Sequence, residues 1–158
     1  MKSRKARKNR KSKPVPVSDH SLRSLLSYNM KRSYLSIQHE LLASLQKFEL
    51  RLSTFSALLL ICDNPDMTQS QLAQALNIER SGVVLLVDEL ENRGLISRNR
   101  VPTDRRSYAL QATPAGTRLR DRAHQRIRER EDTLLHGLSA DERVLLVGLL
   151  ERVEAGVA

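Results

Sequence analysis

The spacing of apolar residues along the chain changes after Gly94, and this change restricts the possible folds. Before Gly94, apolar side chains recur every three or four residues, which is typical of amphipathic helices. After it, LISRNRV and SYALQAT predict two short strands, joined across residues 102–106 as a hairpin. Thr113 and Pro114 then begin another helix, because threonine caps helices well and proline suits their first turn. We therefore expect a mainly α fold with one small β-hairpin.

Two short helices are predicted directly before the hairpin. In TQSQLAQALNI, Thr68 and Gln71 form a capping box, in which each side chain accepts a hydrogen bond from the backbone N–H of the other residue. After a short break, ERSGVVLLVDELENRG predicts a second helix. Its core-facing side carries Val83, Leu86, Val87 and Leu90. Such a pair is a helix-turn-helix, and the hairpin that follows makes it a winged helix-turn-helix.

Apolar helical patterns also flank this unit. From Ser18 or Asp19 to Phe48, the pattern runs without glycine or proline and predicts one amphipathic helix of about 28 residues. A helix of that length outreaches so small a domain and indicates packing against a second chain, although burial in a monomeric core is the alternative. Ser139 and Glu142 form another capping box. The helix that they open carries Leu145, Leu146, Leu149, Leu150 and Val153.

The net charge of +9 is concentrated at the start of the chain. Of the 27 lysines and arginines, eight lie in residues 1–13, which contain no acid, and the remaining 19 face 18 acidic residues. Residues 1–17 have no apolar periodicity, so we expect a disordered basic tail. Because the rest of the chain is nearly neutral, any anionic partner must be bound there by individually placed arginines.

The sequence contains none of the patterns that enzymes and metalloproteins need. There is no glycine-rich phosphate loop, metal-spaced cluster or pair of carboxylates, and the four histidines are scattered, so we expect no enzyme, cofactor or metal. One cysteine excludes an internal disulfide and favours the reducing cytoplasm. No apolar run reaches the roughly 18 to 20 residues that span a bilayer, and none follows the basic start as in a secretory signal. We expect a cytoplasmic protein without a membrane partner.

The chain resembles the MarR family of bacterial transcription regulators, named for multiple antibiotic resistance. The resemblance rests on TQSQLAQALNIERSGVVLLVDELENRGLI, on DRRSYALQATPAG and on the helical flanks, and it covers the chain from about Ser18 onward. The wing motif, DRR followed by TPxG, is the more specific part. The resemblance implies a winged helix-turn-helix over residues 53–113, with dimerisation helices over residues 18–52 and 114–158. It also implies a homodimer on a pseudo-palindromic operator, with repression as the usual outcome.

The resemblance and the helix positions together give a set of DNA-binding candidates. A recognition helix presents its start to the major groove, where Arg80 can donate to guanine and Val84 can meet a thymine methyl group. In the wing, Asp104 would hold Arg106 for insertion into a minor groove while Arg105 reaches a phosphate. The complete set is Ser70, Gln71, Arg80, Ser81, Gly82, Val84, Asp104, Arg105 and Arg106.

Some of these residues also have purely structural explanations. Ser70 and Gln71 lie at a helix start that favours phosphate, but capping is the alternative. Arg80 can equally be a solvated helix start. Family members often carry a polar or basic side chain where this chain has Val84 and Leu85. Either methyl contacts and DNA shape then supply more of the specificity, or Leu85 packs inside the domain.

The resemblance further implies a small aromatic or phenolic acid, or its coenzyme A thioester, as an effector that releases DNA. The candidates combine apolar surface with acid-binding groups, and each has a structural alternative in the core or at the surface. They are Tyr34, His39, Phe48, Arg51 and Phe55.

Three other functions compete with an effector-controlled regulator. Cys62 could sense oxidants, but it ends an apolar run, and the sequence places no cation beside it to lower its pKa. The basic tail could follow phosphates or enter a minor groove, which would suit a sequence-nonspecific architectural protein that binds DNA or RNA. An adaptor that has lost DNA binding is opposed by Asp104, Arg105 and Arg106.

Overall fold

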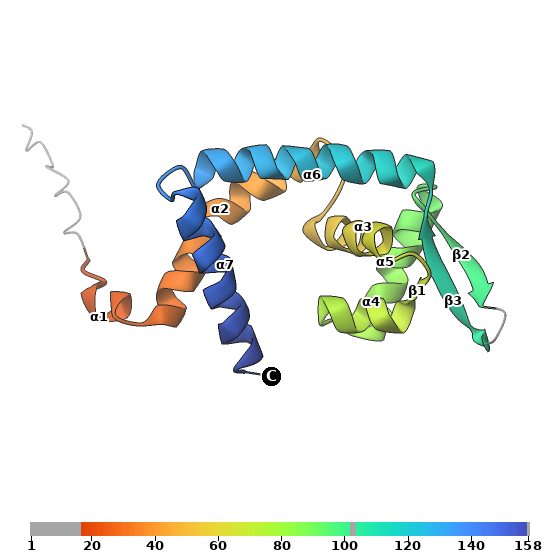
Figure 1. Ribbon diagram of the computed structural model, residues 1–158, viewed down its shortest axis with the longest axis horizontal. Coiled ribbons are helices and arrows are strands. Elements are labelled where there is room, and N and C mark those ends of the chain that lie inside the picture. The colour runs from red at the N-terminus through yellow and green to blue at the C-terminus, as the bar shows by residue number, and fades with distance from the viewer. Residues whose placement is uncertain (1–16, 102–103, 158) are drawn as a thin grey trace, which may run out of the picture. The chain divides into compact units, whose positions relative to one another are not determined.

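The computed structural model describes residues 17–101 and 104–157, and for residues 100, 101 and 104–107 it describes the backbone alone (Figure 1). The basic tail and the tip of the hairpin therefore lie outside the described residues. The elements are α1 His20–Arg23, α2 Leu26–Gln46, α3 Leu52–Asp63, β1 Met67–Thr68, α4 Gln69–Leu76, α5 Arg80–Asn92, β2 Ile96–Val101, β3 Asp104–Ala112, α6 Pro114–Leu134 and α7 Ala140–Ala155.

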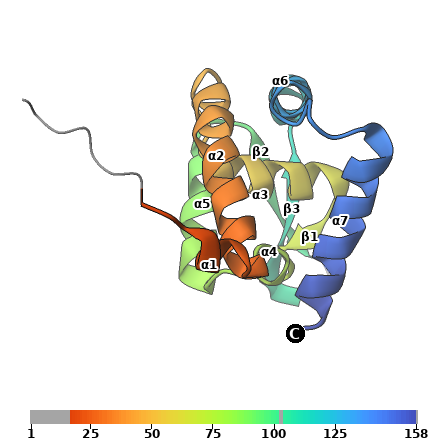
Figure 2. The same cartoon turned by 90° about the vertical axis from the view of Figure 1, so that its left-hand side faces the viewer.

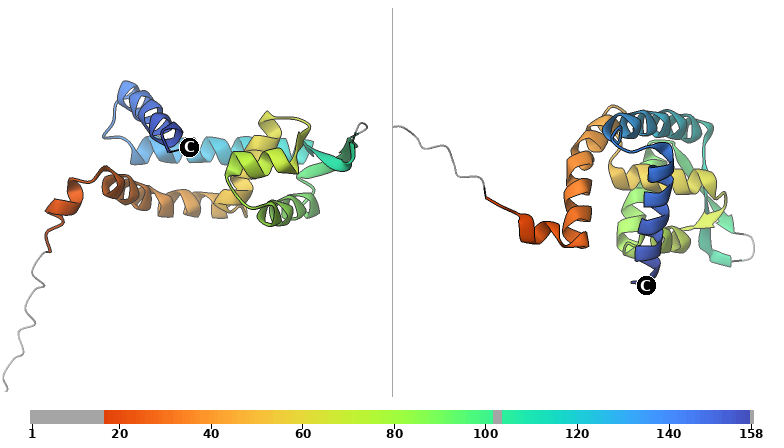
Figure 3. Two further views of the ribbon diagram at one scale, coloured as in Figure 1. Left: turned by 90° about the horizontal axis from the view of Figure 1, so that it is seen from below. Right: turned by 60° about the vertical axis from the view of Figure 1, so that its left-hand side comes forward.

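The expected mainly α fold with a β-hairpin wing is confirmed. Strands β2 and β3 pair antiparallel, from Ile96 opposite Ala112 to Val101 opposite Asp104. The sheet also has a strand that the sequence did not predict, because β1 pairs with β3 and gives the order β1-β3-β2. The hairpin projects beyond the helices that pack against its base (Figure 3).

The contacts of the chain divide it into two units, one ending at Tyr34 and the other beginning at Leu35. In the first unit, the prediction of one unbroken helix is wrong, because α1 and α2 are separated at Ser24 and Leu25. The Asn29 side-chain amide donates to the carbonyls of Arg23 and Leu25, each at 2.8 Å, which stabilises the break. Hydrogen bonds from Tyr28 and Arg23 keep the pKa of Asp19 below its ordinary value.

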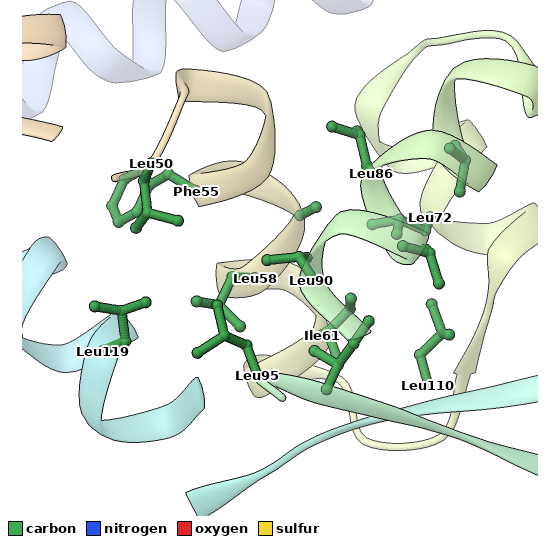
Figure 4. Packing of buried hydrophobic residues seen from close by; sticks show 14 of the residues in the cluster. Leu50, Phe55, Leu58, Ile61, Leu72, Leu86, Leu90, Leu95, Leu110 and Leu119 are labelled. Carbon is green, nitrogen blue, oxygen red and sulfur yellow. The ribbon is translucent and has the colours of Figure 1, made fainter. Parts of the chain in front are cut away.

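The core of the second unit is built around α3. This helix packs against α4, α5, α6 and β3, which explains why FSALLLIC is almost entirely apolar. Figure 2 views α6 end-on with α3 beside it, and Figure 4 shows the packed side chains. Leu58 and Ile61 of α3 meet Leu90 of α5 and Leu110 of β3, and all four are at most 1% exposed. This core holds the helix-turn-helix, the wing and the start of α6 together.

The TPxG motif attaches α6 to the start of the wing. The Thr113 hydroxyl accepts from the Gly116 N–H at 3.0 Å and donates to the carbonyl of Gly94 at 2.7 Å. Gly116 is buried directly against the backbone of Leu95, where a β-carbon would come within 2.0 Å of the carbonyl oxygen. The motif is therefore required by close backbone packing, whatever else it does.

Helix α7 has an apolar surface that the described residues do not cover. Its predicted capping box is confirmed, since Ser139 and Glu142 exchange hydrogen bonds that hold the pKa of Glu142 below its ordinary value. None of its residues is buried. The exposed apolar side chains are Val144, Leu145, Leu146, Val147, Leu149, Leu150 and Val153. Among the described helices, none is long and apolar enough to span a bilayer.

Candidate nucleic-acid interface

Helices α4 and α5 form the predicted helix-turn-helix. The capping box of α4 is confirmed: the Thr68 hydroxyl accepts from the Gln71 N–H at 3.2 Å, and the Gln71 side-chain oxygen accepts from the Thr68 N–H at 2.8 Å. Asn77 ends α4 in a left-handed conformation, with φ at 50°, and so turns the chain toward α5. The oxygen of Gln71 is thus engaged in the cap, whereas Ser70 is exposed at the helix start.

Helix α5 has one buried face and one open face. The four residues predicted for the core, from Val83 to Leu90, are buried as expected. Arg80 and Ser81 are exposed in its first turn, and Gly82 is half-buried beside them. In the next turn, Val84 is 42% exposed and Leu85 is 69% exposed. Packing of Leu85 inside the domain is therefore wrong, and the other explanation, that methyl contacts and DNA shape supply more of the specificity, stays a prediction.

The acidic residues of α5 are held in ion pairs with other elements. Arg98 of β2 bonds to the Asp88 carboxylate, and its Nε lies 3.3 Å from the Glu91 carboxylate. Arg51, before α3, bonds to the carboxylate of Glu89. These pairs fasten the wing and the start of α3 to α5. They also neutralise carboxylates that would otherwise repel a polyanion.

Arg93, at the end of α5, holds the connection between α2 and α3. Its guanidinium donates to the carbonyl oxygens of Glu49 at 2.7 Å and Phe48 at 3.1 Å. Leu50, in the same connection, is 3% exposed. No sequence pattern predicts these contacts of Arg93 and Arg98. Their partners lie on other elements, so no local spacing could have identified them.

The wing residues singled out from the sequence are only partly described. The backbone of Asp104, Arg105 and Arg106 opens β3, with Asp104 opposite Val101. The side chains of these three residues lie outside what the structure describes. Their roles in a minor groove and at a phosphate therefore stay predictions.

The effector candidates occupy dissimilar environments. Tyr34 ends the first unit and is 46% exposed. In the second unit, His39 is exposed on α2, and Phe48 packs against the core from its edge. Phe55 is a core residue with 5% exposure, and Arg51 is paired with Glu89. Phe55 and His39 thus have the environments of their structural alternatives, in the core and at the surface, whereas Arg51 is held in an ion pair.

Cys62 corrects one expectation from the sequence. A cation does lie near it, because α6 brings Arg120 alongside, where Arg120 also pairs with Asp63 at 3.0 Å. Burial nevertheless raises the pKa of the Cys62 thiol above its ordinary value and outweighs the opposing effect of Arg120. The thiol therefore favours its protonated, less reactive form.

In the described part of the chain, no group of histidine, cysteine or acidic side chains is placed to hold a metal ion.

Comparison with known proteins places this arrangement among DNA-binding regulators. A sequence model described as the MarR family matches residues 48–107. The transcriptional repressor CouR, solved with a 23-mer DNA duplex, is similar, with 35% identity and a TM-score of 0.83. The match covers 89% of this chain and 99% of that one. CouR bound to p-coumaroyl-CoA is 31% identical with a TM-score of 0.76, over 88% of this chain and 98% of that one.

A relative from Thauera aromatica is named as a candidate transcriptional regulatory protein for the hcr operon. It is 40% identical over 99 residues, or 63% of this chain. The match spans 60% of the relative's length. The match thus covers a part of each protein and not the whole of either.

Proposed function

The chain belongs to the MarR family of transcriptional regulators, and from this premise we propose that it binds a pseudo-palindromic operator as a homodimer and represses transcription. The single observation that carries the proposal is the open face of α5. Its first turn presents Arg80 and Ser81 outward, while its opposite face is anchored in the core. In this role the protein would bind DNA without catalysing a reaction. It would act in the cytoplasm, where the DNA is.

The proposed contacts divide into those that position the protein and those that select the sequence. Arg80 would donate to a guanine in the major groove, with Ser81, Gly82 and Val84 beside it. Ser70 and Gln71 would approach phosphates at the start of α4, where the backbone N–H groups favour anions. In the wing, Asp104, Arg105 and Arg106 would engage a flanking minor groove and its phosphates.

The proposed dimer uses the flanking regions, residues 18–52 and 114–158. Support comes from α7, whose apolar side chains are between 40% and 74% exposed from Val144 to Val153. Together these side chains form a larger apolar surface than scattered exposed leucines do, and a second copy of the chain can bury it. Two-fold symmetry would then place two α5 helices about 34 to 36 Å apart, one turn of DNA.

The proposed effector is a small aromatic acid or its coenzyme A thioester, as expected of a regulator of aromatic compound catabolism. Support comes from the similarity to CouR bound to p-coumaroyl-CoA. Among the candidates, His39 and Tyr34 have exposed side chains, and Phe48 is half-buried. Phe55 would need the core to open, and Arg51 would need to leave Glu89.

The decisive experiment compares DNA fragments in binding assays with the purified full chain. We expect a dimer in sedimentation and affinity for its own promoter region at least about a hundredfold above that for random DNA. Arg80→Ala should cost about 1 to 3 kcal/mol per half-site and relax the preference at one base pair of each half-site. Arg122→Ala, which removes an exposed arginine of α6, is the matched control and should leave that preference intact.

Other outcomes would favour the competing functions. Equal affinity for promoter and random DNA would indicate a nonspecific architectural protein. A monomer at micromolar concentration would contradict the proposed dimer on two half-sites.

For the effector, aromatic carboxylates and their coenzyme A thioesters are tested for a raised melting temperature and for DNA release. A screen in which no compound changes either quantity contradicts that part of the proposal.

A further inference from the structure

The open face of α5 changes character between its first and second turns. Residues four apart lie above one another on a helix, so Val84 follows Arg80 and Leu85 follows Ser81 on the same side. Arg80 and Ser81 carry hydrogen-bonding groups. Val84 and Leu85 offer only hydrocarbon, and Leu85 is exposed over 69% of its surface. The part of the helix that follows the polar first turn is therefore apolar.

The packing of α5 leaves Leu85 without a structural role in the described residues. The core contacts of the helix are made by Val83, Leu86, Val87 and Leu90, which are at most 6% exposed. A single exposed leucine is common on protein surfaces and carries no meaning by itself. Its position does carry meaning here, because it continues the face that the proposed function directs into the major groove.

The next polar side chains of α5 are poorly suited to base contacts. Asp88 is bonded to Arg98, and Glu89 is bonded to Arg51. Both are acidic, so releasing them would bring negative charge toward phosphates. Beyond Ser81, contacts from the middle of the helix to the DNA therefore fall to the hydrocarbon of Val84 and Leu85.

Hydrocarbon has one complementary feature in the major groove. Thymine presents its C5-methyl group there beside a single acceptor, whereas guanine and adenine each present two hydrogen-bonding groups and cytosine presents a donor. Leucine cannot satisfy those donors and acceptors, and covering them displaces the water that does. Two effects thus favour a methyl group against Leu85: contact buries apolar area, and contact with the other bases would displace water from their hydrogen-bonding groups.

We propose that Leu85, together with Val84, recognises pyrimidine C5-methyl groups near the centre of each half-site, so that methyl contacts set part of the sequence specificity. The inference rests on the proposed function, because it requires α5 to enter the major groove. It extends the methyl contact expected of Val84 to Leu85, whose role the sequence left open. The ligand group is the methyl carbon itself, whether thymine or 5-methylcytosine carries it.

The experiment removes that methyl group without altering base pairing. In the operator that the promoter-binding experiment identifies, each thymine of a half-site is replaced in turn by deoxyuridine, and the affinity of the full wild-type chain is measured. At one or two positions per half-site we expect about a fourfold loss for each methyl group removed. Substitution in both half-sites should lose about fifteenfold. At the same positions, 5-methylcytosine should bind more tightly than cytosine by a similar factor.

Two variants assign the effect to a side chain. Leu85→Ala should bind the thymine operator more weakly and should no longer distinguish thymine from uracil. Combining the Leu85→Ala change with the thymine-to-uracil change measures the coupling between the side chain and the methyl group. Leu52→Ala, which shortens an exposed leucine at the start of α3, is the matched control and should keep the distinction. Circular dichroism and sedimentation check that each variant is folded and dimeric. The wild-type uracil series needs no variant and tests the inference on its own.

Failure of the inference and failure of the proposed function give different results. If the wild-type chain does not bind its promoter DNA specifically, the proposed function fails. If it binds there but no thymine-to-uracil change weakens binding, the methyl recognition is wrong and the proposed function stands. If the uracil effect persists in Leu85→Ala, another side chain contacts the methyl group and the assignment to Leu85 is wrong.

Discussion

A single missing β-carbon allows α6 to begin against the backbone of the wing. At Gly116, an added methyl group would lie 2.0 Å from the carbonyl oxygen of Leu95 and 2.9 Å from its carbonyl carbon. Both atoms belong to the backbone and cannot rotate away. A larger residue must therefore move α6 itself and pull Thr113 from its hydrogen bonds to Gly94 and Gly116.

Gly116→Ala should lower the free energy of unfolding by about 3 kcal/mol or more, in the range of the severe core substitutions. Urea denaturation followed by circular dichroism measures this change. Gly137→Ala is the matched control, because the space that its β-carbon would occupy has no neighbouring atom within 4 Å, and it should change stability by less than about 0.5 kcal/mol. Similar unfolding midpoints for the two variants would contradict the packing argument.

Cys62 should be unreactive at neutral pH. Because burial raises the pKa of its thiol, the folded state favours the protonated form. The contribution of this thiol to the free energy of unfolding is fully present below the ordinary thiol pKa, about 8.5, because the thiol is then protonated in both states. That contribution is lost as the pH rises through the raised pKa of the folded state. We expect slow iodoacetamide labelling at about pH 7 in the folded chain and much faster labelling after unfolding. Peroxide should leave DNA binding unchanged, and rapid labelling of the folded chain would restore the redox hypothesis.

At the scale of elements, α5 is fixed by long-range arginine contacts at several points. Arg98 fastens it to the wing, and Arg93 fastens its end to the connection between α2 and α3. Base contacts need side chains held to a fraction of an ångström, which a helix anchored to its neighbours can provide. The arginines of the fold thus divide into those that position α5 and those, such as Arg80, that are exposed to meet a ligand.

Arg98→Met should loosen the wing from α5 while keeping most of the apolar volume of the side chain. We expect a loss of about 1 kcal/mol in stability, since the ion pairs are only partly buried, and weaker operator binding by an intact dimer. Urea denaturation, sedimentation and DNA titration measure the three quantities. Asp88→Asn in the same background should add little, because the partner charge is already gone. Fully additive losses would show that the pair does not couple the two elements.

The elements that local sequence determines were the ones that could be predicted. The capping boxes at Thr68 and Ser139 join residues three apart, so their chemistry is visible in the sequence alone. The break at Ser24 depends on Asn29, and β1 exists because Met67 can pair with Leu110. The site shows the same limit. The outward face of α5 followed from helical spacing, but the exposure of Leu85 depended on how the whole core packs.

For the whole molecule, the distribution of charge separates two ways of binding DNA. Outside residues 1–13, 19 basic and 18 acidic side chains nearly cancel, and several arginines are committed to ion pairs. Affinity from the folded units must come from placed contacts, which carry sequence information. The eight cations of residues 1–13 can add affinity through phosphates without selecting a sequence.

Removing residues 1–13 should therefore weaken binding to operator and random DNA by similar factors and leave the ratio of the two affinities nearly unchanged. The slope of log affinity against log salt concentration should become shallower, by up to about 7 for each protomer and about 14 for the dimer if all eight cations of each protomer neutralise phosphates. A chain of equal length with the eight lysines and arginines replaced by glutamine separates charge from length and should behave like the deletion. An unchanged slope would show that these cations do not contact DNA, and a selective loss on the operator would show that they contribute to specificity.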